Sequence, residues 1–352
     1  MKKGITKVVA VGIDVGDKTS QVCAKDATGA VVWEKKVKTT EAGFRGALGK
    51  AGPCRIVLEA GSQTHWIKAC LEVLGHQVKV ADPRKLRRIY QSESKSDVRD
   101  ARELAEEALW RWDRMSEVTL RSQRSQEKLA VLKARDALVR ARTALVNLAR
   151  SVLKQEGVVV PKGTPEAFPK KAEPLVPEGQ RAALGPVVKQ IAMQTEEISG
   201  YDRWIEKAGL AEGPVRLMRT TTGVGPVTSA AFVWTLDTPD RFAKSRTVGA
   251  FVGLRPRRDQ SGDTDKELPI TKTGNAFLRR LLVGCAQYIL RRSSPKSALK
   301  DWGLKLAGRG GKRAKRRAVV AVARKLAVIL HRMWVTGEEY VPFPQRARAH
   351  AA

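Results

Sequence analysis

The chain has 352 residues, of which 42% are hydrophobic, so it can form a sizeable core and wholesale disorder is excluded. Its 66 lysines and arginines outnumber its 36 acidic residues and give a formal net charge of +30. This excess indicates a polyanionic partner, because basic side chains near phosphates release condensed counterions. The four cysteines include no Cys-x-x-Cys pair and the four histidines are scattered, so their spacing supports no zinc site.

Membrane insertion is also disfavoured. The most apolar C-terminal run, AVVAVARKLAVILHRMWV, is interrupted by Arg324, Lys325 and Arg332, which a membrane-spanning helix would not tolerate. The short apolar stretch at the N-terminus runs into Asp14 and does not have the form of a signal peptide. We therefore expect a cytoplasmic protein with no membrane partner and with reduced cysteines.

The first ninety residues predict short strands and helices in the order of a known fold. The expected strands cover residues 8–14, 19–25, 30–37, 54–60 and 77–82. The expected helices cover residues 41–51, 65–74 and the basic segment 83–91. Three meandering strands followed by alternating helices and strands are typical of the α/β ribonuclease-H-like fold.

The first expected strand ends on a carboxylate, Asp14, although a buried carboxylate is costly unless it is paired or binds metal. Two architectures use such a residue: ribonuclease-H-like nucleases bind catalytic metal with it, and actin-like ATPases wrap a nucleotide phosphate with a similar loop. The second architecture needs another glycine-rich phosphate loop and an adenosine site in a larger paired lobe, and the sequence shows neither. The nuclease-like interpretation is therefore favoured.

Four acids are the candidate metal ligands. Asp14 and Glu59 each end a predicted strand, and Asp97 and Asp100 stand three residues apart at the start of a predicted helix. Carboxylates in this arrangement suit a pair of Mg²⁺ ions that catalyse phosphoryl transfer. The alternative for any one of them is structural, since Asp97 and Asp100 also favour the positive end of their helix.

The middle of the chain predicts two long helices around a proline-rich connection. Apolar residues alternate three and four apart at Val131, Ala134, Leu138, Ala141, Leu145, Leu148 and Val152. A second such seam consists of Val187, Ile191, Gln194, Ile198, Tyr201 and Ile205. Five prolines between residues 157 and 179 forbid a continuous helix. The pattern indicates an antiparallel hairpin or an oligomerisation arm, and a plain helical packing layer explains the periodicity as well.

A compact C-terminal region begins near Pro214. The segment MRTTTGVGPVTSAAFV has the form helix–Gly-x-Gly–helix, in which Gly223 and Gly225 would let the backbone approach a nucleic-acid phosphate. A tight turn between helices explains the two glycines equally well. A charged stretch with a predicted helix, NAFLRRLLV, follows, and then a basic helix that includes GRGGKRAKRR.

Five segments share their order and spacing with one protein family. They are GIDVGDKTSQV, VLEA, SKSDVRDA, TTTGVGPVTSAA and GLRPRRDQSGDTDKELPITKTGNAFLRRLLV. Together they resemble the DEDD transposases of the insertion sequence one-ten family, over nearly the whole chain from Val8 to Trp334. Only the block from Gly253 to Arg280 would indicate this family by itself, but the five segments together indicate it with high specificity.

The resemblance implies an organisation and an activity. It implies a RuvC-like DEDD domain over residues 1–115, a helical coiled-coil linker over 116–212, a mainly α-helical transposase domain over 213–341 and a tail over 342–352. The implied enzyme is a DNA transposase and recombinase of a bacterial mobile element, associated with the nucleoid. Its partners would be donor and target double-stranded DNA and a bridge RNA that pairs with both. Because recombining two duplexes requires four cuts, we expect a homo-oligomer, either a dimer or a tetramer.

The resemblance also implies a serine nucleophile that forms a 5′-phosphoserine link to DNA. The serine of the family motif Pro-Arg-x-x-Ser-Ser-Gly-Gly corresponds to Ser261. This chain departs from the motif, because Gln260 replaces the first serine and Asp263 replaces the second glycine. Ser261 keeps its neighbour Gly262 and is expected in an exposed loop. No histidine lies nearby in sequence, so Mg²⁺ held by the four acids would have to activate the hydroxyl.

Three basic residues complete the candidate site. Lys272, Arg279 and Arg280 follow the serine motif and would bind scissile or flanking phosphates, unless they form an ordinary solvated helix face. Two other functions stay open: a structure-specific nuclease of the Holliday-junction type that uses only the four carboxylates, and a basic nucleic-acid-binding protein without catalysis. The presence of all four acids argues against the second of these.

Overall fold

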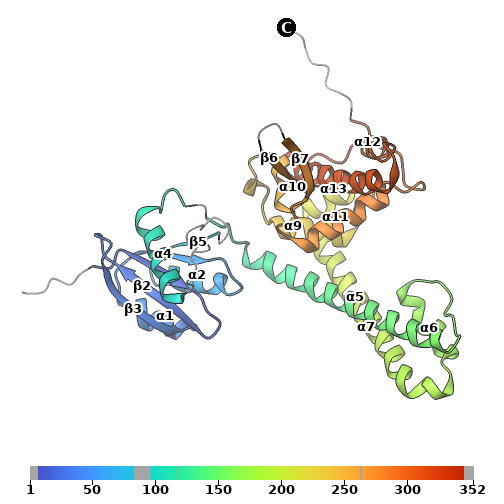
Figure 1. The fold of residues 1–352 in the computed structure, drawn as a ribbon, viewed down its shortest axis with the longest axis horizontal. Helices are drawn as coiled ribbons and strands as arrows, with labels where there is room; N and C mark the ends of the chain where they lie inside the picture. Colours follow the sequence, from blue (N-terminus) through green and yellow to red (C-terminus); the bar gives the residue numbers. More distant parts are fainter. Residues whose placement is uncertain (1–6, 83–95, 116, 262–263, 345–352) are drawn as a thin grey trace, which may run out of the picture. The chain divides into compact units, whose positions relative to one another are not determined.

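The structure, a computed structural model, describes residues 7–82, 96–115, 117–261 and 264–344. The chain divides into two compact units, Met1–Leu120 and Arg121–Ala352 (Figure 1). The predicted basic helix over residues 83–91 lies outside the described residues. Within the described part, no helix is both long enough and apolar enough to cross a membrane.

The first unit is built on a five-stranded mixed sheet in the order β3-β2-β1-β4-β5. The strands are β1 (Ala10–Asp14), β2 (Thr19–Lys25), β3 (Val31–Lys38), β4 (Arg55–Glu59) and β5 (Gln77–Ala81). The first three strands form an antiparallel meander, and β4 and β5 add to β1 in parallel. The strands predicted from the sequence are confirmed, as is the α/β class of this region.

Alternating residues of β1 bury opposite faces of this sheet, as the pleat requires. Val11 and Ile13 pack in a cluster with residues of two helices, α1 (Glu41–Leu48) and α2 (Thr64–Val73). Ala10 packs on the other side with residues of α4 (Asp97–Trp110). The sheet therefore has helices against both faces.

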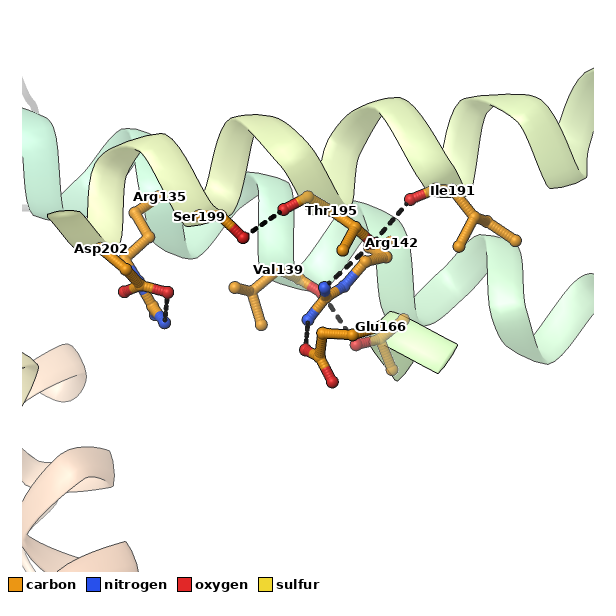
Figure 2. A network of polar contacts seen from close by, with 9 residues as sticks. Arg135, Val139, Arg142, Glu166, Ile191, Thr195, Ser199 and Asp202 are labelled. Atoms are coloured by element: carbon orange, nitrogen blue, oxygen red, sulfur yellow. Dashed lines mark hydrogen bonds and ion pairs between the residues drawn. The ribbon is translucent and has the colours of Figure 1, made fainter. Parts of the chain in front are cut away.

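The second unit begins with two long antiparallel helices, α5 (Gln123–Gln155) and α7 (Arg181–Leu210). The pairs Arg135–Asp202 and Arg142–Thr195 join them (Figure 2). From the first pair to the second the residue number increases on α5 and decreases on α7, as antiparallel helices require. The break that the prolines predict is present and contains short helices. These are η1 (Pro165–Ala167), α6 (Phe168–Ala172), η2 (Glu173–Leu175) and η3 (Glu178–Gln180).

The buried face of α5 is centred one residue after the predicted seam, of which Val131, Leu145 and Val152 are partly buried. The buried side chains of this helix are Ser125, Leu129, Leu132, Arg142, Val146, Ala149 and Leu153. Most of them stand one position after a predicted seam residue, while Leu148 of the predicted seam is 49% exposed. Arg142 is the one charged residue of this buried face. It is only 5% exposed, and its guanidinium lies between Thr195 of α7 and Glu166 of the connection (Figure 2).

On α7 the prediction is better. Ile191, Gln194, Ile198 and Ile205 of the predicted seam are buried. The two helices thus form an antiparallel hairpin, one of the arrangements that the sequence indicates.

The remainder of the second unit is helical apart from one two-stranded sheet. Its helices are α8 (Gly213–Arg219), α9 (Pro226–Leu236), η4 (Pro239–Arg241), η5 (Ser245–Thr247), α10 (Val248–Phe251), α11 (Ala276–Ile289), α12 (Ala298–Ala307) and α13 (Gly311–Thr336). The strands β6 (Pro256–Ser261) and β7 (Thr264–Ile270) pair as an antiparallel hairpin. The most enclosed helix is α9, which is buried from Thr228 to Leu236, and α11 and α13 pack in the same core.

Candidate active site

Two of the four candidate acids end neighbouring parallel strands. Ile13 of β1 is the register partner of Leu58 of β4, so Asp14 and Glu59 are the next residues at the carboxyl edge of the sheet. This is the edge at which open α/β sheets bind their ligands. The sequence interpretation, which placed both residues at strand ends, agrees with this topology.

The other two acids begin α4, which runs antiparallel to β1. Ala10 packs with Leu104 and Ala108, whereas Gly12, two residues later, lies against Ala101 and Ala105. The start of α4 is therefore directed toward the end of β1 that carries Asp14. Asp97 and Asp100 occupy the first turn of α4, behind the N-cap Ser96, whose side chain accepts a hydrogen bond from the Arg99 amide.

Gly12 is the residue that permits this packing. A Cβ atom at this position would lie 2.1 Å from the Ala101 carbonyl oxygen and 2.2 Å from the Ala105 amide nitrogen. No side chain larger than hydrogen fits, so α4 rests directly on the β1 backbone. The small residues Ala101 and Ala105 complete the contact from the helix side, together with Cys23 of β2.

The carboxylates are at one edge of the sheet, but they do not form a ligand cluster. Among the residues that the structure describes, no three His, Cys, Asp or Glu side chains are grouped so that they could hold a metal ion. Asp14, Glu59 and Asp100 each have an interaction partner of their own. Four carboxylates are a suitable donor set for Mg²⁺. The placement of their backbones is compatible with the metal prediction.

Asp82 is an acid that the sequence analysis missed. Glu59 pairs in register with Ala81, and Asp82 follows directly, so three neighbouring parallel strands each lead into a carboxylate at the same edge. The available signal was the one used for Asp14 and Glu59, a charged residue that ends an apolar strand. Asp82 also has an interaction partner.

Ser261 is the last residue of β6 and is exposed. It pairs with Thr264, the first residue of β7, so the hydroxyl is carried at the tip of a hairpin rather than in the loop that the sequence predicts. Opposite charges explain why this charged stretch forms strands: Asp259 faces Lys266, and Arg258 faces Glu267. Gly262 and Asp263, the tip residues of the motif, lie outside the described residues.

A diagonal ion pair stabilises the hairpin next to the serine. Arg258 donates two hydrogen bonds to Asp265, of which Nε to Oδ1 measures 2.7 Å. The Arg258 guanidinium holds the pKa of the Asp265 carboxyl below its usual range. Both side chains are exposed, so this pair sets the register of the strands more than it stabilises the fold.

The base of the hairpin is held by backbone contacts. Gly253 and Gly274, with φ values of 71° and 77°, lie before β6 and after β7. A Cβ on Gly253 would lie 2.1 Å from the Thr273 carbonyl oxygen, so the two ends of the hairpin touch through their main chains. Arg279 Nη1 donates to the carbonyls of Val252 (2.8 Å) and Thr273 (2.9 Å) and bridges the same two ends.

These contacts give two of the three predicted basic residues a structural partner. Arg279 binds backbone carbonyls, and Arg280 forms an ion pair with Asp136 of α5 while its guanidinium lies 5.5 Å from the Phe277 ring. Lys272 is exposed and has a left-handed backbone, with φ 55°. The structure thus leaves the Lys272 side chain open to solvent and shows that Arg279 supports the hairpin.

The two glycines of the helix–Gly-x-Gly–helix segment differ in their surroundings. Gly223 has φ 84°, and a Cβ there would lie 2.9 Å from Tyr288 Cδ1 of α11, so tight packing requires this glycine. Gly225 is the N-cap of α9, and a Cβ atom at this position would meet no other atom within 4 Å. Only the second glycine has the openness that the approach of a phosphate requires.

Comparison with known proteins identifies one family. A family model described as "Transposase", of the IS110 DEDD type, matches residues 11–157, which contain the four acids. A second model, "Transposase IS116/IS110/IS902 family", matches residues 215–302, which contain the serine hairpin.

Curated relatives cover almost the whole chain. The "Transposase for insertion sequence element IS1111A" of Coxiella burnetii is 28% identical over 347 residues, 96% of this chain and 93% of that protein. The "Transposase for insertion sequence element IS1328" of Yersinia enterocolitica is 28% identical over 304 residues, 84% of this chain and 88% of that protein. The predicted resemblance is confirmed. The chain belongs to the IS116/IS110/IS902 family of transposases, enzymes that act on DNA and catalyse strand transfer.

Proposed function

We propose that this transposase exchanges strands between donor and target DNA through a covalent bond to Ser261. The observation that carries the proposal is the placement of this hydroxyl, exposed at the tip of a hairpin whose base is held by Gly253, Gly274 and Arg279. A nucleophile that must reach a DNA backbone needs both exposure and a fixed support.

The proposed step exchanges one phosphodiester bond for another and needs no nucleotide hydrolysis. The Ser261 Oγ atom attacks a backbone phosphorus, and an Oγ–P bond forms as the bond from phosphorus to the 3′ oxygen breaks. The serine proton ends on the released 3′ oxygen, and the 5′ phosphate stays on the protein. Because one phosphodiester replaces another, a 3′ hydroxyl of the second duplex can reverse the step and rejoin the strands.

We further propose that Asp14, Glu59, Asp97 and Asp100 hold Mg²⁺. The support is their common edge of the sheet, the preference of Mg²⁺ for carboxylate oxygens, and the divalent metal that DEDD transposases typically use. Bound Mg²⁺ would stabilise negative charge on the attacking and leaving oxygens. In this proposal residues 1–115 act as a RuvC-like domain, followed by the linker over 116–212, the serine-bearing domain over 213–341 and the tail.

The first experiment replaces the hydroxyl. Ser261→Ala should abolish a protein–DNA adduct at a 5′ end, trapped by denaturation and resolved by gel mobility. DNA affinity should be unchanged, since the substitution removes no charge. Thr264→Val, which removes the hydroxyl opposite Ser261 in the register, is the matched control and should keep the adduct.

The outcomes separate the competing functions. An adduct that persists in Ser261→Ala would show that another residue is the nucleophile. Cleavage that persists without any adduct, and that disappears in Asp14→Ala, would favour the Holliday-junction type of nuclease that uses only the carboxylates. Loss of both activities in Ser261→Ala with binding intact supports the recombinase.

A further inference from the structure

The start of α13 carries a dense basic surface that the proposed chemistry does not use. It consists of Arg309, Lys312, Arg313, Lys315, Arg316 and Arg317, six basic residues within nine positions. All six are exposed. We name this set the α13 basic surface.

The stability of the helix does not explain this composition. The first turn of α13 contains no acidic residue, and its N-cap, Gly310, makes no side-chain hydrogen bond. Cations near the positive end of a helix dipole are destabilising, so the sequence has the reverse of a stabilising pattern. A local conflict of this kind is expected where a surface serves a partner.

The charges are held on a fixed support. After Arg317 the helix enters the core, and Ala318, Val322, Leu326 and Leu330 are fully buried. The rise of about 1.5 Å per residue gives the helical residues Lys312 to Arg317 a span of roughly 7.5 Å, while duplex DNA carries one charge per about 1.7 Å of its axis. Several phosphates lie within reach of such a span.

One ion pair connects this surface to the serine hairpin. Arg317 Nη2 lies 3.4 Å from Oε2 of Glu267, a residue of β7, and both side chains are 62% exposed. An exposed pair of this length contributes little to stability and exchanges readily. Glu267 is therefore an anionic partner of Arg317 that another anion could replace.

We propose that the α13 basic surface binds the backbone of duplex DNA and that Glu267 is an internal competitor for Arg317. The choice of DNA rests on the proposed function, because Arg317 of this surface pairs with the hairpin whose serine must meet DNA. On binding, Arg317 exchanges the carboxylate of Glu267 for a phosphate. The exchange frees Glu267 of β7 from its ion pair with α13.

The two partners of this ion pair give opposite predictions. Arg317→Gln should weaken binding of a DNA duplex several-fold in fluorescence anisotropy, whereas Glu267→Gln should tighten it several-fold. A purely structural pair would give changes of the same sign, because either substitution would loosen the hairpin equally. Glu197→Gln, an exposed acid on α7, controls for the loss of one negative charge.

The salt dependence tests the whole surface. The triple variant Lys312→Gln, Arg313→Gln, Arg316→Gln should lower the slope of log affinity against log salt by up to about 2.7, since each phosphate contact contributes about 0.9. The matched control removes the same charge from exposed positions of α7, as Lys189→Gln, Arg203→Gln, Lys207→Gln. Circular dichroism on each variant verifies that the fold is kept.

Three results would overturn the inference. Equal loss of slope in both triple variants would assign the effect to net charge. Unchanged duplex DNA binding together with weaker binding of a double-stranded RNA would assign the surface to RNA. Changes of DNA affinity with the same sign in Arg317→Gln and Glu267→Gln would show that Glu267 does not compete with DNA for Arg317. The serine chemistry is judged separately, because the triple variant at saturating protein should still form the adduct that Ser261→Ala loses.

Discussion

At the scale of single residues, Gly12 determines how the acid edge is assembled. The first turn of α4 is directed toward Asp14 because the helix can lie against bare backbone at this one position of β1. The positions of Asp97 and Asp100 depend on that contact, although both residues are far from Gly12 in the sequence.

Gly12→Ala should therefore displace α4 and lower both stability and strand transfer. Because the new methyl would meet main-chain atoms that cannot rotate away, we expect the unfolding free energy to fall by about 1–3 kcal/mol or more, measured by urea denaturation. Gly46→Ala is the matched control: it lies in α1, its Cβ would meet nothing within 4 Å, and it should stabilise by about 0.5–1 kcal/mol. An unchanged unfolding midpoint for Gly12→Ala would contradict this packing.

At the scale of elements, the α5–α7 hairpin has apolar side chains that its own packing does not bury. Leu148 of α5 is 49% exposed, and Met193 and Trp204 of α7 are 53% and 43% exposed. Leu148 of the predicted seam thus lies beside the buried face of α5 and is open to solvent.

If this face mediates assembly, Leu148→Asp should reduce the oligomer to a smaller species in multi-angle light scattering. A charge at a buried subunit contact is costly, whereas in an isolated hairpin the half-exposed position should tolerate it. Asn147→Asp adds the same charge one residue earlier, at an exposed position, and should leave the mass unchanged. The same mass for both variants would show that Leu148 does not contact another subunit.

The comparison of this hairpin with the sheet shows which predictions a sequence supports. Strands such as β1 were predictable because apolar residues alone determine their burial and a turn follows each of them. The face of α5 was not, because Arg142 is buried through hydrogen bonds to Thr195 and Glu166, partners 53 and 24 residues away. Periodicity counts Arg142 as a surface residue, and adjacent apolar pairs such as Leu145 and Val146 leave open which row is buried.

The candidate site shows the same division. Strand-end acids were predictable from local pattern, and Asp82 could have been found by the same rule. The hairpin around Ser261 was not expected, since its strands are exposed and charged and depend on cross-strand pairs such as Arg258–Asp265. The bonds of Arg279 to Val252 and Thr273 could not be predicted, because these residues meet only in the folded chain.

At the scale of the whole molecule, the net charge of +30 exceeds what one basic surface explains. We propose that a bridge RNA, which the family resemblance implies, also binds the chain and selects the donor and target DNA. A second polyanion is consistent with basic residues in both units.

This proposal predicts that the protein retains RNA during purification. Expressed together with the DNA that flanks its gene, the chain should copurify with one discrete RNA, detected by sequencing and removed by ribonuclease. Expression without the flanking DNA is the control and should yield only a heterogeneous mixture. The same mixture in both preparations would contradict a dedicated guide.

The fastening of the serine hairpin has a consequence for how the sequence can change over generations. Gly253, Gly274 and the bonds from Arg279 to main-chain carbonyls hold the base, so the fold of the base does not depend on which side chains stand next to Ser261. Substitutions near Ser261, such as the Gln260 and Asp263 of this chain, are therefore exposed to selection for chemistry and are largely hidden from selection for folding. A transposon copy can therefore accumulate substitutions near Ser261 while its transposase still folds.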